Sequence, residues 1–367
     1  MIFTILFYTF VVVTAIQIVY YLSFSLFVFQ KQENTLSNTN IPVSVIVYVK
    51  NNAKTLAEYI QNLTKQKHPN FEIVMVNNAS NDTTLEIIEN LQLEYPNIKV
   101  VNVKNTEAFW ANKKYALTLG VKAATYEYLL FTELGSKALS KNWIDEITCY
   151  FSQEKSIVIG YQKLKRKKKS FSNLLFRFDH LSNTIQAFSY AKFGAPYKAT
   201  NHNLAYTKEE FFKVNGYINH LALFMGEGDL FLKDAATNQN TIVATTPNSF
   251  VCSTKYLSFK EWFLQQKKQS ILFSLYKPKH KFLLSFFKLS KFLFYVLAVC
   301  ITYINWKIAL PLIISYYLIQ YIIVGKLATK LQERNTILLL PLLEVCLVLL
   351  QIIIFISNQI SKPKHWK

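Results

Sequence analysis

Three short polar stretches in the first 140 residues carry side chains that could bind a ligand. Asn51 follows one apolar run, the stretch Asn77–Asp82 follows a second, and Glu133 follows a third. An amide side chain offers both a hydrogen-bond donor and an acceptor, and a carboxylate is a ligand for a hard cation. Asn, Ser and Asp after a strand are also ordinary turn and N-cap residues, and this alternative stays open for each stretch taken alone.

The polar stretches occupy regular places in an alternating pattern of strands and helices. Short β-branched apolar runs predict strands at Val43–Val49, Phe71–Val76, Ile98–Val103 and Tyr126–Thr132. Apolar residues at helical spacing predict helices at Lys54–Gln66, Thr83–Leu93 and Lys113–Ala124. Such alternation predicts an α/β domain with a doubly wound, mostly parallel, Rossmann-like sheet, in which ligands bind beyond the carboxyl ends of the strands.

Several common enzyme classes lack support in the chain. There is no GxGxxG, GxxxxGK[ST] or GxSxG motif, and only eight glycines are present, which disfavours dinucleotide-binding, P-loop and serine-hydrolase enzymes. The net charge of +19 is large, but apolar runs flank the basic block. Anionic lipid headgroups are therefore the expected counter-surface, and no nucleic-acid partner is expected.

The two ends of the chain are long enough and apolar enough to cross a membrane. Residues 1–30 hold no charge, and as a helix Ile2–Phe29 would span about 40 Å, more than the ~30 Å of a hydrocarbon core. A cleaved signal peptide is the alternative, although no Lys or Arg precedes Lys31. Two or three further passes are expected in the apolar runs Phe292–Trp306, Ile308–Gly325 and Thr336–Ser361.

The distribution of basic residues predicts how the chain is organised around the membrane. Lys31 and the stretch Lys277–Lys291 lie next to membrane ends, so the central polar block is expected to be cytoplasmic, most simply at a bacterial inner membrane. Glu344 is the only acidic residue in the apolar runs, which disfavours a transporter. The expected parts are an N-terminal transmembrane helix, a globular domain, an interfacial amphipathic segment and C-terminal transmembrane helices, at residues 1–30, 41–255, 256–291 and 292–361.

Four segments in a fixed order carry a family resemblance. They are Pro42-Val-Ser-Val-Ile-Val, the lead from Gln66 to Val76, Gly194-Ala-Pro-Tyr, and the stretch Asn203–Tyr217. Together they resemble the family 2 glycosyltransferases, membrane-bound enzymes with a nucleotide-sugar-binding α/β domain of the type called GT-A. The resemblance covers about Pro42 to Tyr276 and implies a GT-A-like fold.

The resemblance implies an inverting hexosyltransferase-type enzyme. It would move a sugar from a nucleotide-diphosphate donor to a lipid-linked or cell-envelope polysaccharide acceptor, in contact with membrane lipids. Two family motifs differ here, because Asp-Asp-x-Ser-x-Asp reads Asn77-Asn78-Ala79-Ser80-Asn81-Asp82 and Asp-x-Asp reads Glu133-Leu134-Gly135. These differences support an alternative, a catalytically degenerate relative that acts as an assembly or regulatory partner.

The same resemblance implies a donor site. Its expected nucleotide-sugar-binding residues are Asn51, Asn78, Asp82, Lys113, Lys114 and Glu133. In the family the Asp-x-Asp carboxylates bind a divalent cation, so Glu133 alone would bind Mg²⁺ or Mn²⁺ weakly. Lys113 and Lys114 are candidates to neutralise the leaving diphosphate instead, and solvated lysines are the simpler alternative.

The expected general base lies in the segment Met225-Gly226-Glu227-Gly228-Asp229-Leu230, which resembles the family's G-[ED]-D-x-D-L. Glu227 falls at the catalytic Asp, where a carboxylate takes the proton from the acceptor hydroxyl. Asp229 is the second candidate. The alternative is an acidic first turn of a helix.

A last resemblance concerns the stretch Phe259–Gln269, which is similar to the family's interfacial helix with its Q-x-x-R-W motif. Here Gln266, Lys267 and Lys268 would contact the diphosphate or the acceptor, while Trp262 lies in the headgroup layer. A membrane-surface helix without chemistry explains the same residues.

Overall fold

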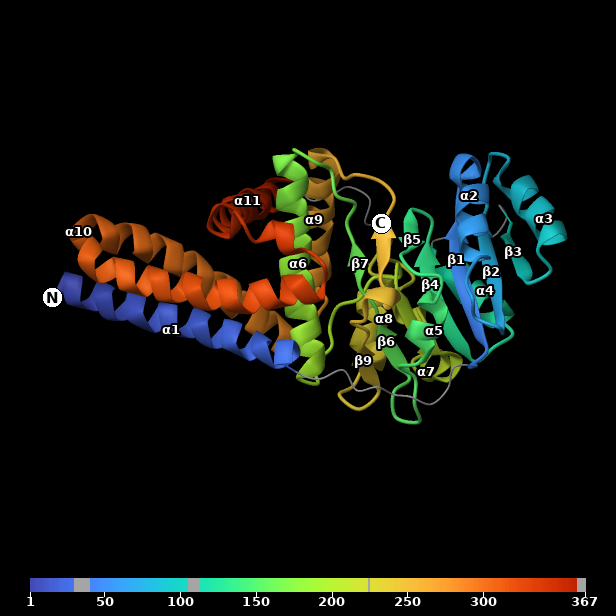
Figure 1. Cartoon of the computed structure of the whole chain (residues 1–367), viewed down its shortest axis with the longest axis horizontal. Coiled ribbons are helices and arrows are strands. Elements are labelled where there is room, and N and C mark those ends of the chain that lie inside the picture. The colour runs from blue at the N-terminus through green and yellow to red at the C-terminus, as the bar shows by residue number, and fades with distance from the viewer. Residues whose placement is uncertain (30–39, 105–112, 224, 362–367) are drawn as a thin grey trace. The chain divides into compact units, whose positions relative to one another are not determined.

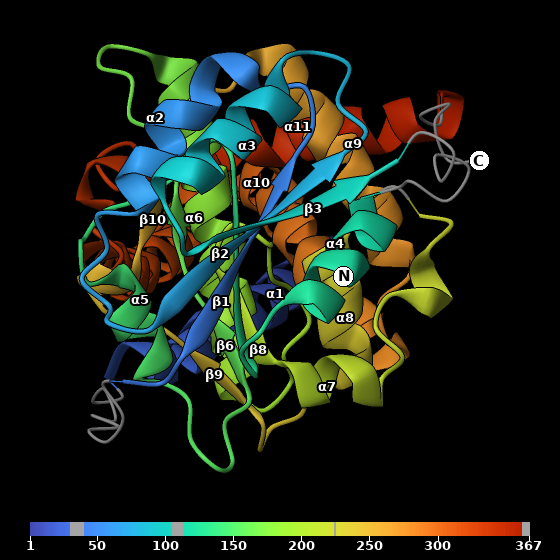
Figure 2. The same cartoon turned by 90° about the vertical axis from the view of Figure 1, so that its right-hand side faces the viewer.

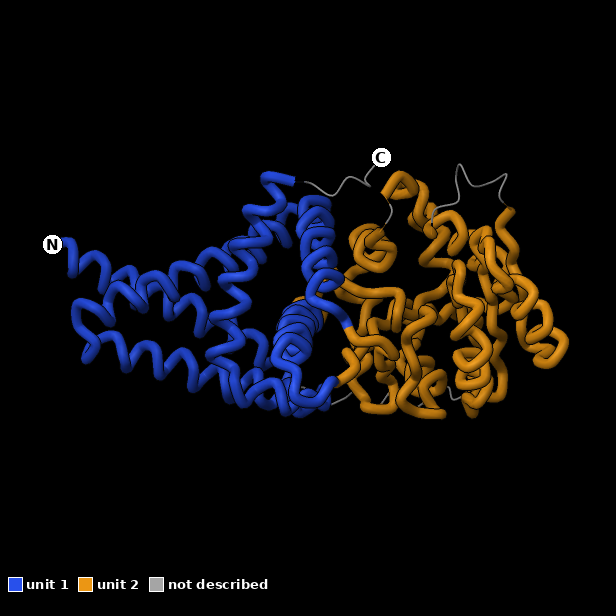
Figure 3. The backbone as a smooth tube through the Cα atoms, turned by 90° about the horizontal axis from the view of Figure 1, so that it is seen from above, with its two compact units in different colours: residues 1–31, 167–189, 257–363 blue, residues 32–166, 190–256, 364–367 orange. Residues whose placement is uncertain are grey.

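The computed structural model describes residues 1–29, 40–104, 113–223 and 225–361. The chain divides into two compact units, coloured separately in Figure 3. The helical unit comprises residues 1–31, 167–189 and 257–363, and the sheet unit comprises residues 32–166, 190–256 and 364–367. Lys31, which contributed to the expected orientation, lies outside the described residues.

In the part of the chain that the structure describes, the sheet unit has ten strands with short helices between them. The strands are β1 (Val43–Val49), β2 (Phe71–Asn78), β3 (Ile98–Val103), β4 (Tyr128–Glu133), β5 (Ser136–Ala138), β6 (Ile157–Ile159), β7 (Gln162–Lys163), β8 (Leu204–Thr207), β9 (Thr241–Val243) and β10 (Val251–Ser253). The α-helices are α2 (Ala53–Leu63), α3 (Thr84–Glu94), α4 (Lys113–Ala123), α5 (Trp143–Thr148), α7 (Lys208–Lys213) and α8 (Glu227–Ala235). The described residues of this unit also include 3₁₀ turns at Ile218–His220 and Pro247–Ser249.

The main sheet has the strand order β3-β2-β1-β4-β8-β6-β9. β1 pairs in parallel with both β2 and β4, and β8 is antiparallel to its two neighbours, β4 and β6. β5, β10 and β7 form a separate three-stranded sheet. The strand order reverses between β1 and β4, and such a switch point is where open α/β sheets bind ligands.

Alternating residues of β1 and β2 face two different layers of helices. Val45 and Met75 pack with Leu56 of α2 and Ile88 of α3 in one buried cluster. On the other face Gly120 of α4 lies so close that a Cβ there would meet the Val76 side chain at 2.6 Å. Because side chains alternate along a strand, the apolar runs that predicted these strands cover both faces. Figure 2 shows α2 and α3 on one side of the strands and α4 on the other.

The helical unit contains five long helices. They are α1 (Ile2–Phe29), α6 (Phe171–Lys192), α9 (Phe259–Ser274), α10 (Pro278–Lys330) and α11 (Leu340–Ile360), with a 3₁₀ turn at Arg334–Thr336. Among the described residues, α1, α10 and α11 are long and apolar enough to cross a membrane. α1 and α11 lie within the apolar runs at residues 1–30 and Thr336–Ser361, whereas α10 contains both runs between Phe292 and Gly325 and begins earlier, at Pro278.

α10 is a helical hairpin rather than one straight rod. Tyr295 and Tyr317 are 22 residues apart, which would separate them by about 33 Å in a straight helix, yet their hydroxyl oxygens are 3.1 Å apart. The backbone leaves the helical region at Asn305 (φ −152°, ψ 88°), and the two arms fold back there. Figure 1 shows both arms running alongside α1. The junction between the predicted apolar runs Phe292–Trp306 and Ile308–Gly325 therefore lies at the turn of the hairpin.

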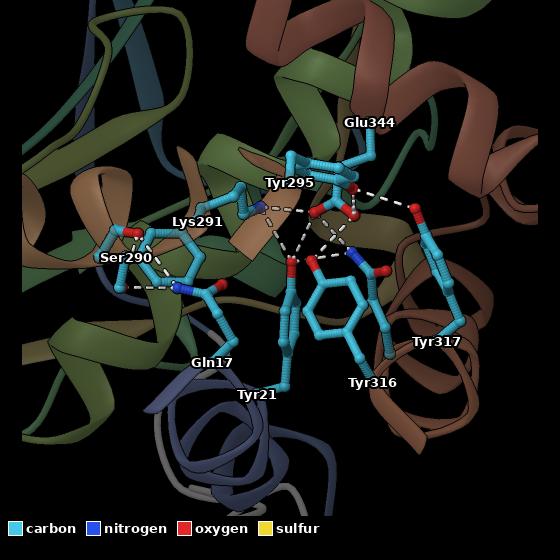
Figure 4. Close-up of polar contacts among 10 residues, drawn as sticks. Gln17, Tyr21, Ser290, Lys291, Tyr295, Tyr316, Tyr317 and Glu344 are labelled. Carbon is cyan, nitrogen blue, oxygen red and sulfur yellow. Dashed lines mark hydrogen bonds and ion pairs between the residues drawn. The ribbon is translucent and has the colours of Figure 1, made fainter. Parts of the chain in front are cut away.

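A buried carboxylate links all of these apolar helices. Glu344 of α11 is 3% exposed and accepts five hydrogen bonds, which Figure 4 shows. The donors are the Lys291 ammonium (2.6 Å), the hydroxyls of Tyr21 (2.9 Å), Tyr295 (2.6 Å) and Tyr316 (2.9 Å), and the Gln320 amide (2.7 Å). The donors come from α1 and from both arms of α10, so this cluster, here called the Glu344 cluster, specifies how the helices pack.

The helix α6 belongs to the helical unit, although the sequence placed its residues inside the globular domain. Trp262 of α9 stacks on Phe176 of α6, with ring centroids 4.9 Å apart. The Trp262 indole N–H also donates to Asp179 of α6 at 3.0 Å. Trp262 is only 3% exposed, so its ring packs inside this unit and does not have the exposed face expected of a headgroup-layer residue.

Candidate active site

The candidate site lies where β1 and β4 end, at the switch point of the sheet. Tyr48 and Glu133 are register partners near the carboxyl ends of these two strands. The first residue of α4, Lys113, places its ammonium 5.6 Å from the centre of the Tyr48 ring. Strand pairing therefore brings together side chains that are 85 residues apart in the sequence.

Lys113 and Glu133 form the central ion pair of the site. The Lys113 ammonium donates to Glu133 Oε1 at 2.6 Å, and both side chains are partly buried. Burial alone would raise the pKa of the Glu133 carboxyl, but the charge of Lys113, helped by His202, outweighs burial and holds this pKa at about 2. Burial would likewise lower the pKa of Lys113, and the carboxylates of Glu133 and Glu227 raise it instead. Both groups are therefore charged at neutral pH.

Glu227 faces the same ammonium from another element. It is the first residue of α8, follows Gly226 in the left-handed conformation (φ 79°), and places Oε2 3.8 Å from Lys113 Nζ. The neighbouring Lys114 is fully buried and donates to the carbonyls of Leu223 and, at 2.8 Å, Met225. The first turn of α4 therefore contacts Glu133 and also fixes the loop that leads to Glu227.

Asp229, the second acidic candidate, is directed elsewhere. It is 4% exposed, and its Oδ1 accepts a hydrogen bond from the backbone N–H of Ala199 at 3.1 Å. A Cβ on the adjacent Gly228 would lie 2.4 Å from the Ala199 carbonyl oxygen. Asp229 and Gly228 thus dock α8 onto the segment before β8, and Glu227 is the carboxylate that faces Lys113.

Asn78 lies beside the ion pair at the end of β2. Its amide donates to the Tyr48 hydroxyl at 2.9 Å. The preceding Asn77, also in β2, donates to Asn102 of β3 at 2.9 Å and accepts from Ser80 of the following loop at 2.6 Å. Of the two amides that replace the family's aspartates, Asn78 is the one in contact with the site residue Tyr48.

Asn51 and Asp82 connect the loops after β1 and β2. The Asn51 side chain accepts from the Asn81 N–H at 2.8 Å. Asp82 accepts from the N–H of Thr84 at 3.1 Å and of Ala53 at 3.3 Å, which lie at the starts of α3 and α2. The hydrogen bonds to Thr84, first from its hydroxyl, lower the pKa of Asp82. The capping role that the sequence left open therefore describes the contacts of Asp82.

His202 was not among the predicted site residues. Its Nδ1 lies 3.8 Å from Glu133 Oε2 and 3.1 Å from the Ser136 hydroxyl, which accepts from Gln162 at 2.8 Å. The available signal was its position immediately before Asn203, where the acceptor-side motif begins. A lone histidine in a loop carries no spacing pattern, so only the fold connects it to Glu133.

Gln266, Lys267 and Lys268 lie on α9 of the helical unit. The Gln266 amide donates to Asp179 at 2.8 Å. Lys267 is 9% exposed, and its ammonium donates to the carbonyl of Ser361 at 2.7 Å and to Ser357. Lys268 is half-buried. Gln266 and Lys267 thus make hydrogen bonds within their own unit.

The residues that the structure describes contain no group of three or more His, Cys, Asp and Glu side chains placed to hold a metal ion. The position of the family's second Asp-x-Asp carboxylate is Gly135, at φ +98°. Glu133 has one oxygen in the ion pair with Lys113. This donor set does not fit the two-carboxylate cation site that the resemblance implies.

Comparisons with known proteins show what the chain is similar to. Residues 44–211 match the family described as Glycosyl transferase family 2. The glycosyltransferase GlyG of Streptococcus pneumoniae serotype 4 (strain ATCC BAA-334 / TIGR4) is 28% identical over 120 residues, which make up 32% of this chain and 38% of that protein. The match thus spans well under half of the length of this relative.

A solved structure has a similar fold. The mannosyltransferase PcManGT from Pyrobaculum calidifontis, in complex with GDP-Man and Mn²⁺, matches with a TM-score of 0.55 at 15% identity. The match covers 94% of this chain and 99% of that chain. It supports the GT-A-like sheet with N- and C-terminal apolar helices. The matched family, the similar fold and the ordered segments together support a family 2 glycosyltransferase.

Proposed function

We propose that this protein is a membrane-bound, inverting glycosyltransferase that moves a hexose from a nucleoside-diphosphate sugar to a lipid-linked or cell-envelope polysaccharide acceptor. The observation that carries the proposal is the placement of the Glu227 carboxylate opposite the Lys113–Glu133 ion pair, at the switch point of the sheet. This arrangement puts a proton acceptor next to a cationic group where such sheets bind ligands.

The proposed reaction is a single displacement at the anomeric carbon. Glu227 takes the proton of the acceptor hydroxyl as that oxygen bonds to the anomeric carbon. The bond from this carbon to the phosphate oxygen breaks, and the nucleoside diphosphate leaves with the electron pair. Asn78 and Asn51 are the proposed partners of the nucleoside, because Asn78 ends β2 and Asn51 lies in the loop after β1. Asp229 is a positioning residue that holds α8.

Three apolar helices support the proposed membrane location. They are long enough to span a bilayer, and membrane lipids are the expected surroundings of α1, α10 and α11. The lysines between Lys277 and Lys291 favour a cytoplasmic sheet unit under the positive-inside rule, as at a bacterial inner membrane. A lipid-linked acceptor suits an enzyme that is tethered to the membrane.

We expect Mg²⁺ and Mn²⁺ to bind weakly at Glu133. A single carboxylate is a poor site for a hard cation, and an ammonium group already occupies one of its oxygens.

The second candidate function is a non-catalytic assembly or regulatory partner. It is favoured by the hydrogen bonds of Asn77 to Asn102 and Ser80 and by the loss of the second Asp-x-Asp carboxylate. The two candidates differ in whether the sheet unit binds a nucleotide and in whether Glu227 is needed for turnover.

The test combines nucleotide binding with one substitution. Calorimetry on the detergent-solubilised chain should give micromolar to millimolar affinity for UDP or GDP. Release of UDP or GDP from a panel of nucleotide sugars, with membrane lipid extract as acceptor, should fall by roughly 100-fold or more in Glu227→Gln, because the general base is lost. Nucleotide affinity should change less than about threefold, since an isosteric amide preserves the packing.

Glu154→Gln, a change of an exposed glutamate in the same unit, is the matched control and should retain full turnover. Turnover by Glu227→Gln at the normal rate would place the base elsewhere. Absence of UDP and GDP binding under all conditions would favour the non-catalytic candidate.

A further inference from the structure

The position of Lys113 suggests a second role for its ammonium group. The resemblance places a divalent cation against the Asp-x-Asp carboxylates, which here read Glu133-Leu134-Gly135. In the structure the Lys113 ammonium lies at that carboxylate, 2.6 Å from Glu133 Oε1 and 3.8 Å from Glu227 Oε2. The chain's own cation thus stands between the two carboxylates of the site.

The side chains that the structure describes around Glu133 do not form a binding site for a metal ion. A dication at Glu133 would lie beside the Lys113 ammonium, and two cations in a partly buried site repel each other. The second Glu133 oxygen is 3.8 Å from His202 Nδ1, and this nitrogen is hydrogen-bonded to Ser136. With one Glu133 oxygen bonded to Lys113 and His202 Nδ1 bonded to Ser136, these groups do not supply the oxygen-rich, near-octahedral shell that Mg²⁺ requires.

The formal charge of the site is nevertheless suited to a diphosphate. Lys113 and Lys114 both lie in the first turn of α4 and together carry the charge of one divalent cation. The buried Lys114 ammonium is anchored on the carbonyls of Leu223 and Met225, directly before Glu227. The two lysine charges therefore balance the charges of the Glu133 and Glu227 carboxylates, as one divalent cation would.

Lys113 also has hydrogen-bonding capacity left for a ligand. An ammonium group carries three N–H donors. Among the described residues, Glu133 is the one acidic partner of Lys113 within hydrogen-bonding distance, because Glu227 is at 3.8 Å. A phosphate oxygen could therefore bond to the same nitrogen without breaking the ion pair that holds it in place.

We infer that the Lys113 ammonium takes the place of the divalent cation, binding the diphosphate oxygens of the donor directly, so that donor binding does not require a metal ion. This inference rests on the proposed function. In this arrangement Glu133 is a positioning residue, whose carboxylate holds Lys113 at the switch point.

Nucleotide binding in the absence of metal is the first test. Calorimetry with UDP and with GDP is carried out on the full chain, once in EDTA and once in excess MnCl₂. The affinity of the better ligand should differ by less than about threefold between the two conditions. Lys113→Met should weaken it at least tenfold in both conditions, while Lys113→Arg should retain most of it, because the guanidinium keeps the charge.

Lys122→Met is the matched control, because Lys122 lies on the same helix α4 with an exposed side chain. It should bind the nucleotides like the unaltered chain. An equal loss in Lys122→Met and Lys113→Met would show only a general effect of positive charge and would overturn the inference.

A reversed-charge variant gives a readout that needs no nucleotide. Lys113→Glu places a third carboxylate opposite Glu133 and Glu227, which should create a site for Mn²⁺. Titration followed by electron paramagnetic resonance should detect bound Mn²⁺ in this variant and at least tenfold weaker binding in the unaltered chain. Equal or tighter Mn²⁺ binding by the unaltered chain would overturn the inference.

The outcomes separate the inference from the proposed function. Nucleotide binding that needs Mn²⁺ would reject the role of Lys113 and leave the glycosyltransferase function standing. Absence of nucleotide binding in both EDTA and MnCl₂ would reject the proposed function, and the inference with it. If Lys113→Met does not fold, the comparison of EDTA with MnCl₂ on the unaltered chain and on Lys113→Arg decides the question.

Discussion

Lys114 is a fully buried lysine. We expect its protonation state to change the affinity of the proposed diphosphate site for a nucleotide. Burial lowers the pKa of Lys114 to about 8, while Glu227 raises it and Lys113 lowers it further. The charged form is therefore complete below about pH 7 and is lost as the pH rises through about 8. A neutral amine still has two donors for the carbonyls of Leu223 and Met225, so the loop before Glu227 should keep its place.

We predict that nucleotide affinity falls as the pH rises from 7 to 9.5. The expected loss is roughly fivefold, corresponding to about 1 kcal/mol of charge attraction. The measurement is calorimetry with UDP or GDP at several pH values. Folding stability should change in the opposite direction, rising between about pH 8 and the ordinary lysine pKa of 10.5, because the unfolded chain binds the proton more tightly.

The comparison variant is Lys114→Arg, whose side chain does not titrate in this range. Its affinity should show no such decline. If the nucleotide affinity of the unaltered chain does not change between pH 7 and 9.5, the titrating charge that attracts the nucleotide is not that of Lys114.

Candidate site residues could be suggested from the sequence where they directly follow a predicted strand. The sequence suggested Asn78 and Glu133 from the polar stretches after two strands and Glu227 from a short acidic motif, and their roles stay predictions. The ion pair of Lys113 with Glu133 was not predicted as a contact, since 20 residues separate the partners and the packing of α4 against β1 and β2 brings Lys113 to the end of β4. His202 had no pattern of its own, and its position depends on the pairing of β8 with β4.

At the scale of elements, the placement of Glu227 depends on how closely α8 approaches the segment before β8. Gly228 lies against the carbonyl of Ala199, and Asp229 accepts a hydrogen bond from the N–H of the same residue. These two contacts fix the first turn of α8, which begins at Glu227. The absence of a side chain at Gly228 is therefore a geometric requirement.

We predict that Gly228→Ala reduces turnover by about 100-fold, because a shift of ~1 Å in a reacting group has an effect of this size. The added Cβ would lie 2.4 Å from a backbone oxygen, which cannot rotate away, so α8 must move. Overpacking should also lower the free energy of unfolding by about 1–3 kcal/mol. Nucleotide release from nucleotide sugars and thermal unfolding are the measurements.

Gly325→Ala provides the control, since its Cβ would meet Ile337 at an ordinary 3.9 Å. It should leave turnover unchanged. If Gly228→Ala is as active as this control, α8 is not fixed by the contact with Ala199.

The elements themselves were largely predictable from periodicity. Val43–Val49 and Ile98–Val103 have the predicted bounds, because unbroken β-branched runs between turn residues are a strong strand signal. α6 could not be assigned to its unit from the sequence, since its association depends on Asp179 and Phe176 meeting Trp262, more than 80 residues later.

For the whole molecule, the Glu344 cluster is the feature that specifies the helical unit. An apolar helix has little preference for one partner over another in lipid, whereas a buried carboxylate with five donors has one arrangement that satisfies it. The sequence identified Glu344 as an isolated acid in an apolar run. Its ion pair with Lys291 required the hairpin of α10, which brings both arms to the same place.

We predict that Glu344→Gln destabilises the helical unit by about 3–5 kcal/mol, because the buried Lys291 ammonium loses its counter-charge. The measurement is the thermal unfolding midpoint of the protein in detergent or nanodiscs. Nucleotide affinity of the folded protein should stay within about twofold of normal, since the residues proposed to bind the nucleotide belong to the sheet unit.

The double change Glu344→Gln with Lys291→Met should recover most of the lost stability, because no unpaired charge remains. Equal stability of Glu344→Gln and the unaltered chain would mean that the ion pair does not specify the helix packing.

Asn203 restricts how the protein can be re-engineered. Its amide donates to the carbonyls of Tyr161 (3.1 Å) and Ser249 (2.8 Å) and accepts from the Trp143 indole (3.1 Å), while a Cβ on Gly160 would touch it at 2.3 Å. It opens the very motif that a protein engineer would randomise to obtain new acceptor preferences. Most substitutions of Asn203 would remove these hydrogen bonds and disturb the packing of the sheet unit. A library designed to change the proposed acceptor preference should therefore keep Asn203 and vary the residues on either side of it.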